Sequence, residues 1–347
     1  MTLSSEVISQ SDSAAPASNP LVSAIKMVFL KVGVLPFFLA IAVVIFALVS
    51  SQFLSFQNLL NVGRQSVYLI LVSLGQMLVL IAGGFDLSVG TVIALTSVVS
   101  ATTMVTMAAA FPEMLWLAVV LGAGAGVSAA LLIGSINAIG VSRFEVSPFI
   151  MTLGVQSVGA GVALFITGGV PITGLPAGFG EVFGFGRVLG TPVPVVFAIV
   201  AVALVWLLMN RTRLGAAIYA VGGNARAANL SGINNRRTLF FSYLFCSLLA
   251  SIAGLLLTAR VESGETNLGG SVALESIAAC VISGVSLRGG MGRVENVVLG
   301  GFFIVLVQNG MNIAKVGSYM HMVLLGSLLI LAAVFDQFRY RVLVGAS

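Results

Sequence analysis

Charged residues are scarce in this chain. They make up 8% of its 347 residues, whereas roughly a quarter of the residues of a soluble globular domain are charged. Hydrophobic residues make up 59%, and the mean hydropathy is +1.13. These values exclude a soluble domain and indicate an integral membrane protein. No basic run is interleaved with exposed aromatic residues, so the net charge of +5 gives no reason to expect nucleic-acid binding.

Residues for metal, disulfide and enzymatic chemistry are also few. The single histidine, His321, has no second ligand at metal spacing, and the two cysteines, Cys246 and Cys280, lie in apolar stretches. No phosphate-binding Gly-x-x-x-x-Gly-Lys-[Ser/Thr] sequence is present, so any nucleotide hydrolysis belongs to another polypeptide. The sequence therefore predicts a protein that is not an enzyme and that binds no cofactor and no metal ion.

Acidic and basic residues are missing from the middle of the apolar stretches that precede residue 238. A stand-alone secondary carrier or channel is expected to use a relay of acids or histidines inside the membrane. Their absence disfavours such a carrier, which stays an alternative to transport that is driven by a partner protein.

Long apolar stretches dominate the rest of the chain. They are about 20 residues long and lack the ten-residue alternation of outer-membrane strands, so we expect membrane-spanning helices. The expected fold class is all-α, a polytopic membrane helical bundle of about ten helices. The predicted spans are 34–53, 66–82, 89–109, 114–139, 146–167, 193–209, 238–259, 271–287, 294–313 and 319–335.

The basic residues orient these spans. With a cytoplasmic N-terminus, the inside loops hold Lys26, Lys31, Arg143, Arg211, Arg213, Arg226, Arg236, Arg237, Arg288, Arg293, Arg339 and Arg341, and the outside loops hold Arg64, Arg187, Arg260 and Lys315. This excess follows the positive-inside rule and predicts that both termini are cytoplasmic. The expected organisation is a largely disordered cytoplasmic tail (1–32), a transmembrane domain (33–338) that contains a cytoplasmic loop (211–237), and a short cytoplasmic tail (339–347).

Two Gly-rich segments, 83–90 and 283–290, resemble each other weakly. They read Gly-Gly-Phe-Asp-Leu-Ser-Val-Gly and Ser-Gly-Val-Ser-Leu-Arg-Gly-Gly, and both lie in predicted cytoplasmic turns between spans. Duplicated transporter halves would produce such a repeat, and so would chance. Within the first segment, Asp86 and Ser88 are expected to cap the helix that starts near Val89. A direct role in gating or translocation is the alternative.

Polar side chains on the apolar faces are candidates for lining a pathway. Glu275, with Ser271 and Asn267 nearby, lies near the outer end of the eighth span, where it could contact a polyhydroxylated solute or face solvent. Amides donate and accept hydrogen bonds and suit a neutral substrate, but hydrogen bonds between helices explain them equally well. The amides are Gln76, Asn137, Gln156, Gln308, Asn309 and Asn312, and we take Gln308 and Asn309 as translocation candidates.

The cytoplasmic loop 211–237 contains a predicted short helix. Gly222 and Gly223 interrupt the preceding structure, Asn224 is a favoured N-cap, and Gly232 stands where a helix-ending glycine is expected. The residues between these ends are Ala225, Arg226, Ala227, Ala228, Asn229, Leu230 and Ser231. A short rigid helix of small residues suits insertion into a cleft of another protein, and a solvated loop without a partner is the alternative.

Motifs spread over nearly the whole chain resemble a known family. They lie at 83–90, 152–154, 167–169, 215–232, 275–279, 286–292 and 308–310. In their order and spacing they closely resemble the permease subunits of bacterial ribose-, xylose- and arabinose-type ABC importers, over about residues 35–339. Phe85 and Ser283 depart from the aliphatic residue and the glycine that are more usual in that family.

The resemblance implies a multi-pass permease of the bacterial inner membrane that translocates a pentose or a related neutral sugar. The implied partners are cytoplasmic ATPase subunits that use ATP and Mg²⁺, a periplasmic sugar-binding protein, a second copy of this or a related permease, and membrane lipid. The resemblance also implies that residues 224–231 couple to the ATPase. The same machinery acting on a sugar alcohol, a furanose signal molecule or a branched-chain amino acid is the alternative.

Overall fold

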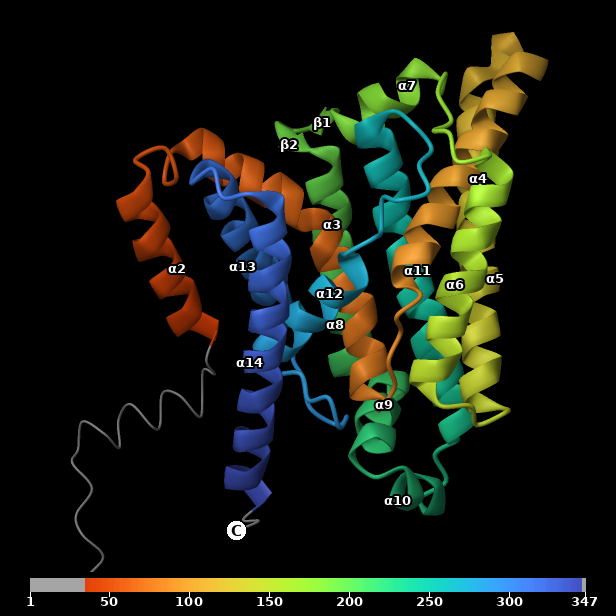
Figure 1. Cartoon of the computed structure of the whole chain (residues 1–347). Helices are drawn as coiled ribbons and strands as arrows, with labels where there is room; N and C mark the ends of the chain where they lie inside the picture. The colour runs from red at the N-terminus through yellow and green to blue at the C-terminus, as the bar shows by residue number, and fades with distance from the viewer. Residues whose placement is uncertain (1–34, 345–347) are drawn as a thin grey trace, which may run out of the picture.

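The computed structural model describes residues 35–344, which form an almost entirely helical chain (Figure 1). The helices are α2 (Leu35–Val49), α3 (Phe56–Ile81), α4 (Val89–Ala110), η1 (Pro112–Met114), α5 (Leu115–Ser142), α6 (Pro148–Thr167), α7 (Ala177–Phe179), η2 (Gly180–Gly184), α8 (Val193–Arg211), α9 (Arg213–Gly223), α10 (Ala225–Leu230), α11 (Asn235–Val261), α12 (Val272–Ile282), α13 (Val294–Ile313) and α14 (Ser318–Val344). Between η2 and α8, β1 (Arg187–Val188) pairs antiparallel with β2 (Thr191–Pro192). The predicted N-terminal tail, 1–32, lies outside the described residues.

Seven helical segments of the described chain are long and apolar enough to cross a membrane: Phe56–Ile81, Val89–Ala110, Pro112–Ser142, Pro148–Thr167, Val193–Arg211, Asn235–Val261 and Val294–Ile313. Each coincides with a predicted span, so the prediction of an all-helical membrane protein is confirmed. The other three predicted spans fall on α2, α12 and α14, whose apolar helical stretches have 10–17 residues. The helix lengths therefore do not establish ten crossings.

The predicted start of the second span was wrong. It was placed at Ser66, with Arg64 in an outer loop, but α3 begins at Phe56. The hydroxyl of Ser55 accepts a hydrogen bond from the Asn58 N–H (3.3 Å), which is the usual N-cap arrangement. Arg64 therefore lies inside a helix rather than in an outer loop.

Two hydrophobic cores share α3, the most buried of the candidate spans. The larger core joins α3 to α4, α5, α8, α9 and α11, and the second joins it to α2, α12, α13 and α14. Figure 1 shows α2, α13 and α14 on one side and α4, α5 and α6 on the other, with α3 between them. Because α3 contributes residues to both cores, it connects the two halves of the bundle.

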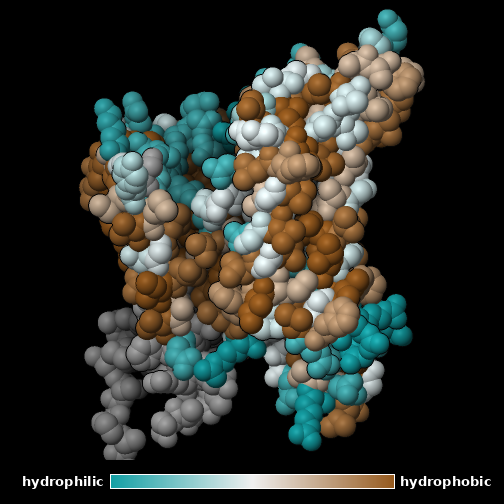
Figure 2. All heavy atoms as spheres, turned by 45° about the vertical axis from the view of Figure 1, so that its right-hand side comes forward, coloured by the Kyte–Doolittle hydropathy of each residue, from teal (hydrophilic) through white to brown (hydrophobic). Residues whose placement is uncertain are grey.

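The flank of the molecule is apolar. Figure 2 shows hydrophobic residues covering it between hydrophilic residues at the two ends. On α6 and α8, for example, Val158 is 68% exposed, Phe165 89% and Leu204 60%. Such a band matches the hydrocarbon layer of a bilayer, whereas a soluble protein does not expose apolar patches of this extent.

Candidate functional site

Two helices, α4 and α12, begin inside the bundle. At the start of α4, the Thr91 hydroxyl donates a hydrogen bond to the Gln156 carbonyl oxygen (2.9 Å), near the middle of α6. The segment before α4, residues 85–88, is not helical, yet Asp86 and Ser88 are fully buried. The chain therefore turns at the end of α3 and runs back into the bundle before α4 starts (Figure 1). Irregular backbone at such a depth occurs where protein or water surrounds it.

The helices that precede the two irregular turns, α3 and α12, end in the same way. Gly83 (φ 88°) and Gly284 (φ 87°) are left-handed. In each case the N–H groups of the glycine and of the next residue return to carbonyl oxygens of the last helical turn (2.9–3.0 Å). The predicted repeat thus has a structural counterpart, but its alignment was wrong by one residue, because Gly83 corresponds to Gly284 and not to Ser283.

A buried polar network holds the irregular segment before α4. The Asp86 Oδ1 atom accepts hydrogen bonds from the Ser88 N–H (2.9 Å) and hydroxyl (2.6 Å), and Asn137 Nδ2 donates to Ser88 Oγ (2.7 Å). The Gln76 amide lies against the Asp86 backbone, where it can donate to the carbonyl oxygen (3.0 Å) and accept from the N–H (3.3 Å). The buried Cys246 thiol also lies within hydrogen-bonding reach of the Asp86 carboxylate, whereas Asn137 Oδ1 has no hydrogen-bond partner among the described residues.

The network corrects two expectations. Asp86 was placed in a cytoplasmic turn, but it is completely buried in the bundle. Ser88 occupies the N-cap position of α4, but its side chain makes no capping hydrogen bond to the helix. Instead, Asp86 fixes the approach to α4, and its carboxylate lies close to the positive end of the α4 dipole.

The segment before α12 meets the segment before α4. A Cβ atom on Gly90 would overlap the carbonyl oxygen of Gly269, and a Cβ on Gly269 would overlap that of Gly90. At this contact, which we call the Gly90–Gly269 crossing, the starts of α4 and α12 lie together. Nearby Asn267 and Ser271 are exposed. Irregular backbone is not exposed to lipid, so this surface faces water or another protein and is a candidate translocation surface.

The other predicted pathway residues are dispersed. Glu275 lies in the first turn of α12, next to the crossing, and is partly exposed, and Gln308 is partly buried in α13. Asn309 exchanges two hydrogen bonds with Asn58 of α3 (2.9 and 3.0 Å). This pairing agrees with the second interpretation of the amides in the sequence, hydrogen bonding between helices.

Asn309 is far from the Asp86 network. It contacts α3 at Asn58, whereas Asp86 contacts α3 at Gln76. These two positions on α3 are separated by five helical turns, or about 27 Å. The structure therefore groups Asp86, Ser88 and the start of α12, and places Asn309 elsewhere.

The short helix predicted within residues 211–237 is confirmed as α10, and its cytoplasmic location stays a prediction. Asn224 Oδ1 accepts a hydrogen bond from the Ala227 N–H (2.9 Å), as expected of an N-cap. At the other end Gly232 is left-handed (φ 82°), and its N–H and that of Ile233 return to the helix (3.0 Å each). Leu230 is 82% exposed, and Figure 1 shows α10 at one extreme of the molecule. The helix offers an exposed apolar and basic surface.

The sequence missed the contacts that hold α10 in place. The preceding helix, α9, is tied to the chain between α12 and α13, because the Tyr219 hydroxyl donates to the Gly292 carbonyl oxygen (2.9 Å). Burial raises the pKa of Tyr219, Glu295 raises it further and Arg293 opposes the shift. Nearby, Trp206 Nε1 donates to Glu295 (2.6 Å). An aromatic residue within a basic loop was the available signal for this anchor.

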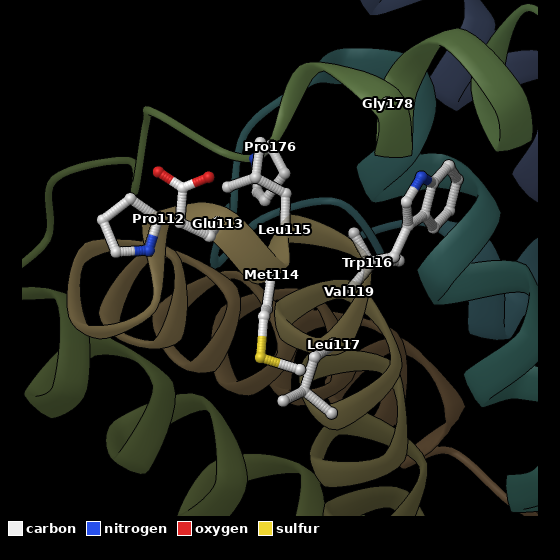
Figure 3. A pocket seen from close by; sticks show the side chains of 9 residues that line it. All are labelled: Pro112, Glu113, Met114, Leu115, Trp116, Leu117, Val119, Pro176 and Gly178. Carbon is white, nitrogen blue, oxygen red and sulfur yellow. The ribbon is translucent and has the colours of Figure 1, made fainter.

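A shallow depression of about 510 Å³ is lined in part by Gly178 of α7 (Figure 3). Figure 1 shows α7 at the end of the molecule opposite α10. The lining of the depression comes from η1, the start of α5 and the 168–192 loop, and Glu113 is the charged member of that lining. The Trp116 ring lies beneath Gly178 (Figure 3). The depression does not reach the Gly90–Gly269 crossing, since η1 continues directly from the far end of α4. Among the described residues no group of acids, histidines and cysteines could hold a metal ion.

Comparisons with known proteins agree with the sequence motifs. Residues 58–333 match the family described as branched-chain amino acid transport system / permease component. The chain is 36% identical to the ribose import permease of Bacillus subtilis, over 86% of this chain and 90% of that one. It is 35% identical to the D-allose transport system permease of Escherichia coli (87% and 90%) and 34% identical to the galactose/methyl galactoside import permease of the same organism (90% and 96%). No solved structure matches the chain.

Proposed function

This chain belongs to the family of branched-chain amino acid transport permease components, and from that membership we propose that it is the permease subunit of an ATP-driven monosaccharide importer. It is a multi-pass protein of the bacterial inner membrane and a transport subunit rather than an enzyme. The sugar, a pentose or a related neutral sugar, is delivered by a periplasmic binding protein. The relatives named for ribose, D-allose and galactose support a sugar over a branched-chain amino acid.

The observation that carries the proposal is α10. An ATP-driven importer that has no nucleotide-binding sequence of its own must receive its energy through contact with a separate ATPase. The capped helix offers Arg226 and the exposed Leu230 at the hydrophilic end of the bundle. Residues 224–231 are the coupling element, which inserts into a cleft of the ATPase, and ATP and Mg²⁺ bind to that partner.

A second permease copy covers the surface around the Gly90–Gly269 crossing. The exposed irregular backbone at Asn267 and Ser271 requires protein or water beside it rather than lipid. Two copies facing each other there enclose a pathway lined by the start of α12, including Glu275. ATP-driven closure of the ATPase subunits moves both copies of α10, and the pathway opens alternately to the two sides.

The C-terminal helix α14 ends on the ATPase side. α14 ends at the same extreme of the molecule as α10 (Figure 1), which supports a cytoplasmic C-terminus. With α2, α12 and α14 counted as membrane segments, the bundle has ten of them, and the excess of basic residues on the α10 side follows the positive-inside rule.

Reconstitution tests the function. Proteoliposomes that contain the permease, its ATPase and its binding protein should accumulate radiolabelled ribose, D-allose or galactose only with ATP. Uptake that persists without the ATPase would establish a secondary carrier and overturn the proposal. ATP-dependent uptake of leucine in place of every sugar would retain the importer and reassign its substrate.

A further inference from the structure

Three parts of the chain that are distant in sequence meet backbone to backbone beside α10. They are the end of α3, the end of α9 and the turn between α12 and α13. A Cβ atom on Gly222 would overlap the Ile81 carbonyl oxygen and lie 2.6 Å from the Gly290 nitrogen. The Gly290 N–H donates a hydrogen bond to that same carbonyl oxygen (2.9 Å). The contact therefore leaves no room for any side chain at position 222.

The left-handed glycines complete this contact. Gly289 has φ 90°, and a Cβ there would lie 2.8 Å from the Gly222 carbonyl oxygen and 3.1 Å from the Cα atom of Gly83. We call the set Gly83, Gly222, Gly289 and Gly290 the glycine junction. Side chains can change rotamer to absorb a small displacement, but touching backbones cannot. A force on one of the three segments is therefore passed directly to the other two.

The glycine junction lies between α10 and the Gly90–Gly269 crossing. Gly222 is two residues before Asn224, the N-cap of α10. Gly83 opens the irregular segment that leads to α4, and Gly289 follows α12 in the chain. Both helices that these two glycines adjoin along the chain, α4 and α12, start at the Gly90–Gly269 crossing. Tyr219, one turn before Gly222, adds its hydrogen bond to Gly292 (2.9 Å) and keeps α9 on the same turn.

We propose that the glycine junction positions the transport pathway relative to the coupling helix, so that a displacement of α10 moves the starts of α4 and α12 together. This inference rests on the proposed function, because it assumes that an ATPase acts on α10. It assigns a role to backbone contacts that bind neither ATP nor sugar. A substitution that disrupts the glycine junction should uncouple ATP hydrolysis from sugar transport, while the ATPase and the binding protein still bind.

The test compares alanine substitutions at three glycines in the complete reconstituted importer. Gly222→Ala forces the backbones of the junction apart. Gly223→Ala adds the same methyl group one residue later, where a Cβ would meet no atom within 4 Å, and Gly124→Ala does so on the exposed face of α5. The measurements are the amount of ATPase that co-purifies, the rate of ATP hydrolysis, and the sugar transported per ATP hydrolysed.

Gly222→Ala should retain the bound ATPase and its hydrolysis, while sugar transported per ATP falls at least tenfold. Gly223→Ala should have a smaller effect, and Gly124→Ala should match the wild type within twofold. A wild-type transport ratio in Gly222→Ala would overturn the inference. If Gly222→Ala does not assemble, Tyr219→Phe is measured in its place, because it adds no atoms to the protein. It should lower the sugar transported per ATP about threefold. An unchanged value would count against the role of the glycine junction. ATP-independent uptake by the wild type would instead refute the proposed function.

Discussion

The capping of α10 gives the sharpest prediction for ATPase coupling. The helix has only six residues, and isolated helices shorter than about 12 residues are marginal in water. Its folded state therefore depends on few contacts: the Asn224 cap, the hydrogen bonds from the N–H groups of residues 231–233 back to the helix, the bond from Asn235 Nδ2 to the Ala225 carbonyl oxygen (2.7 Å), and the buried Ala228. Asn224→Ala removes the cap, which typically costs about 1 kcal/mol.

This loss lowers the ratio of helical to non-helical α10 about fivefold, because about 1.4 kcal/mol corresponds to a factor of ten. Only the helical form is competent to dock, so the apparent Kd for the ATPase should rise by up to about fivefold. The assay is a titration of the ATPase onto the permease in lipid nanodiscs. Membrane insertion and yield should stay at the wild-type level, since Asn224 is exposed outside the bundle.

Asn224→Ser is the matched control, because serine caps helices about as well as asparagine. It should bind the ATPase within a factor of two of the wild type. Equal weakening by serine and alanine would mean that Asn224 contacts the ATPase directly rather than acting as a cap. Wild-type affinity in Asn224→Ala would remove α10 as the docking element, and loss of insertion would reduce the loop to a topology signal.

Three further predictions concern the bundle. Asp86→Ala should lower the thermal stability of the detergent-solubilised protein, because it leaves two buried Ser88 donors without their acceptor, at a cost of about 1–3 kcal/mol each. Asp86→Asn keeps an acceptor oxygen and should lower the thermal stability clearly less. A double-mutant cycle with alanine at Asn58 and Asn309 should give a coupling energy of about 0.5–2 kcal/mol and an unchanged KM for uptake, and a raised KM for Asn309→Ala would favour a pathway role. Burial raises the pKa of Tyr219 above 10.0, so its contribution to stability is complete below pH 10 and is lost as the pH rises through the folded-state pKa. The difference in melting temperature between wild type and Tyr219→Phe should therefore be smaller at pH 10.5 than at pH 8.

Local structure in this chain could be predicted because its causes are local. α10 was predicted with both of its ends because the Asn224 cap acts on a residue three positions away, and Gly232 acts on the turn just before it. The long apolar helices were likewise predicted, since a run of about 20 apolar residues has few other stable conformations in a membrane. The role of α10 in coupling remains a prediction.

The interior arrangement was not predictable by the same reasoning. Hydropathy describes how apolar a stretch is and carries no information on whether the chain crosses the bundle or turns back inside it. Asp86 in a Gly-rich sequence has the composition of a surface turn, yet its segment folds back beside Gln76. Likewise, the apolar residues of 271–287 suggested one full span, whereas α12 ends at Ile282 ahead of a left-handed glycine.

The glycines show why sequence and structure must be combined to find coupling residues. The chain has forty glycines, and small residues throughout a membrane bundle are explained by close helix packing. What separates Gly222 from Gly124 is the space around each: carbonyl and amide groups of two other segments surround the first, and a Cβ on the second would meet no atom within 4 Å. Through these contacts Gly222 lies against Ile81, which is 141 positions earlier in the chain, and against Gly290, which is 68 positions later. A side chain can transmit motion only as firmly as its rotamers allow, so an energy-coupled transporter gains a stiffer connection where its moving segments touch through backbone alone.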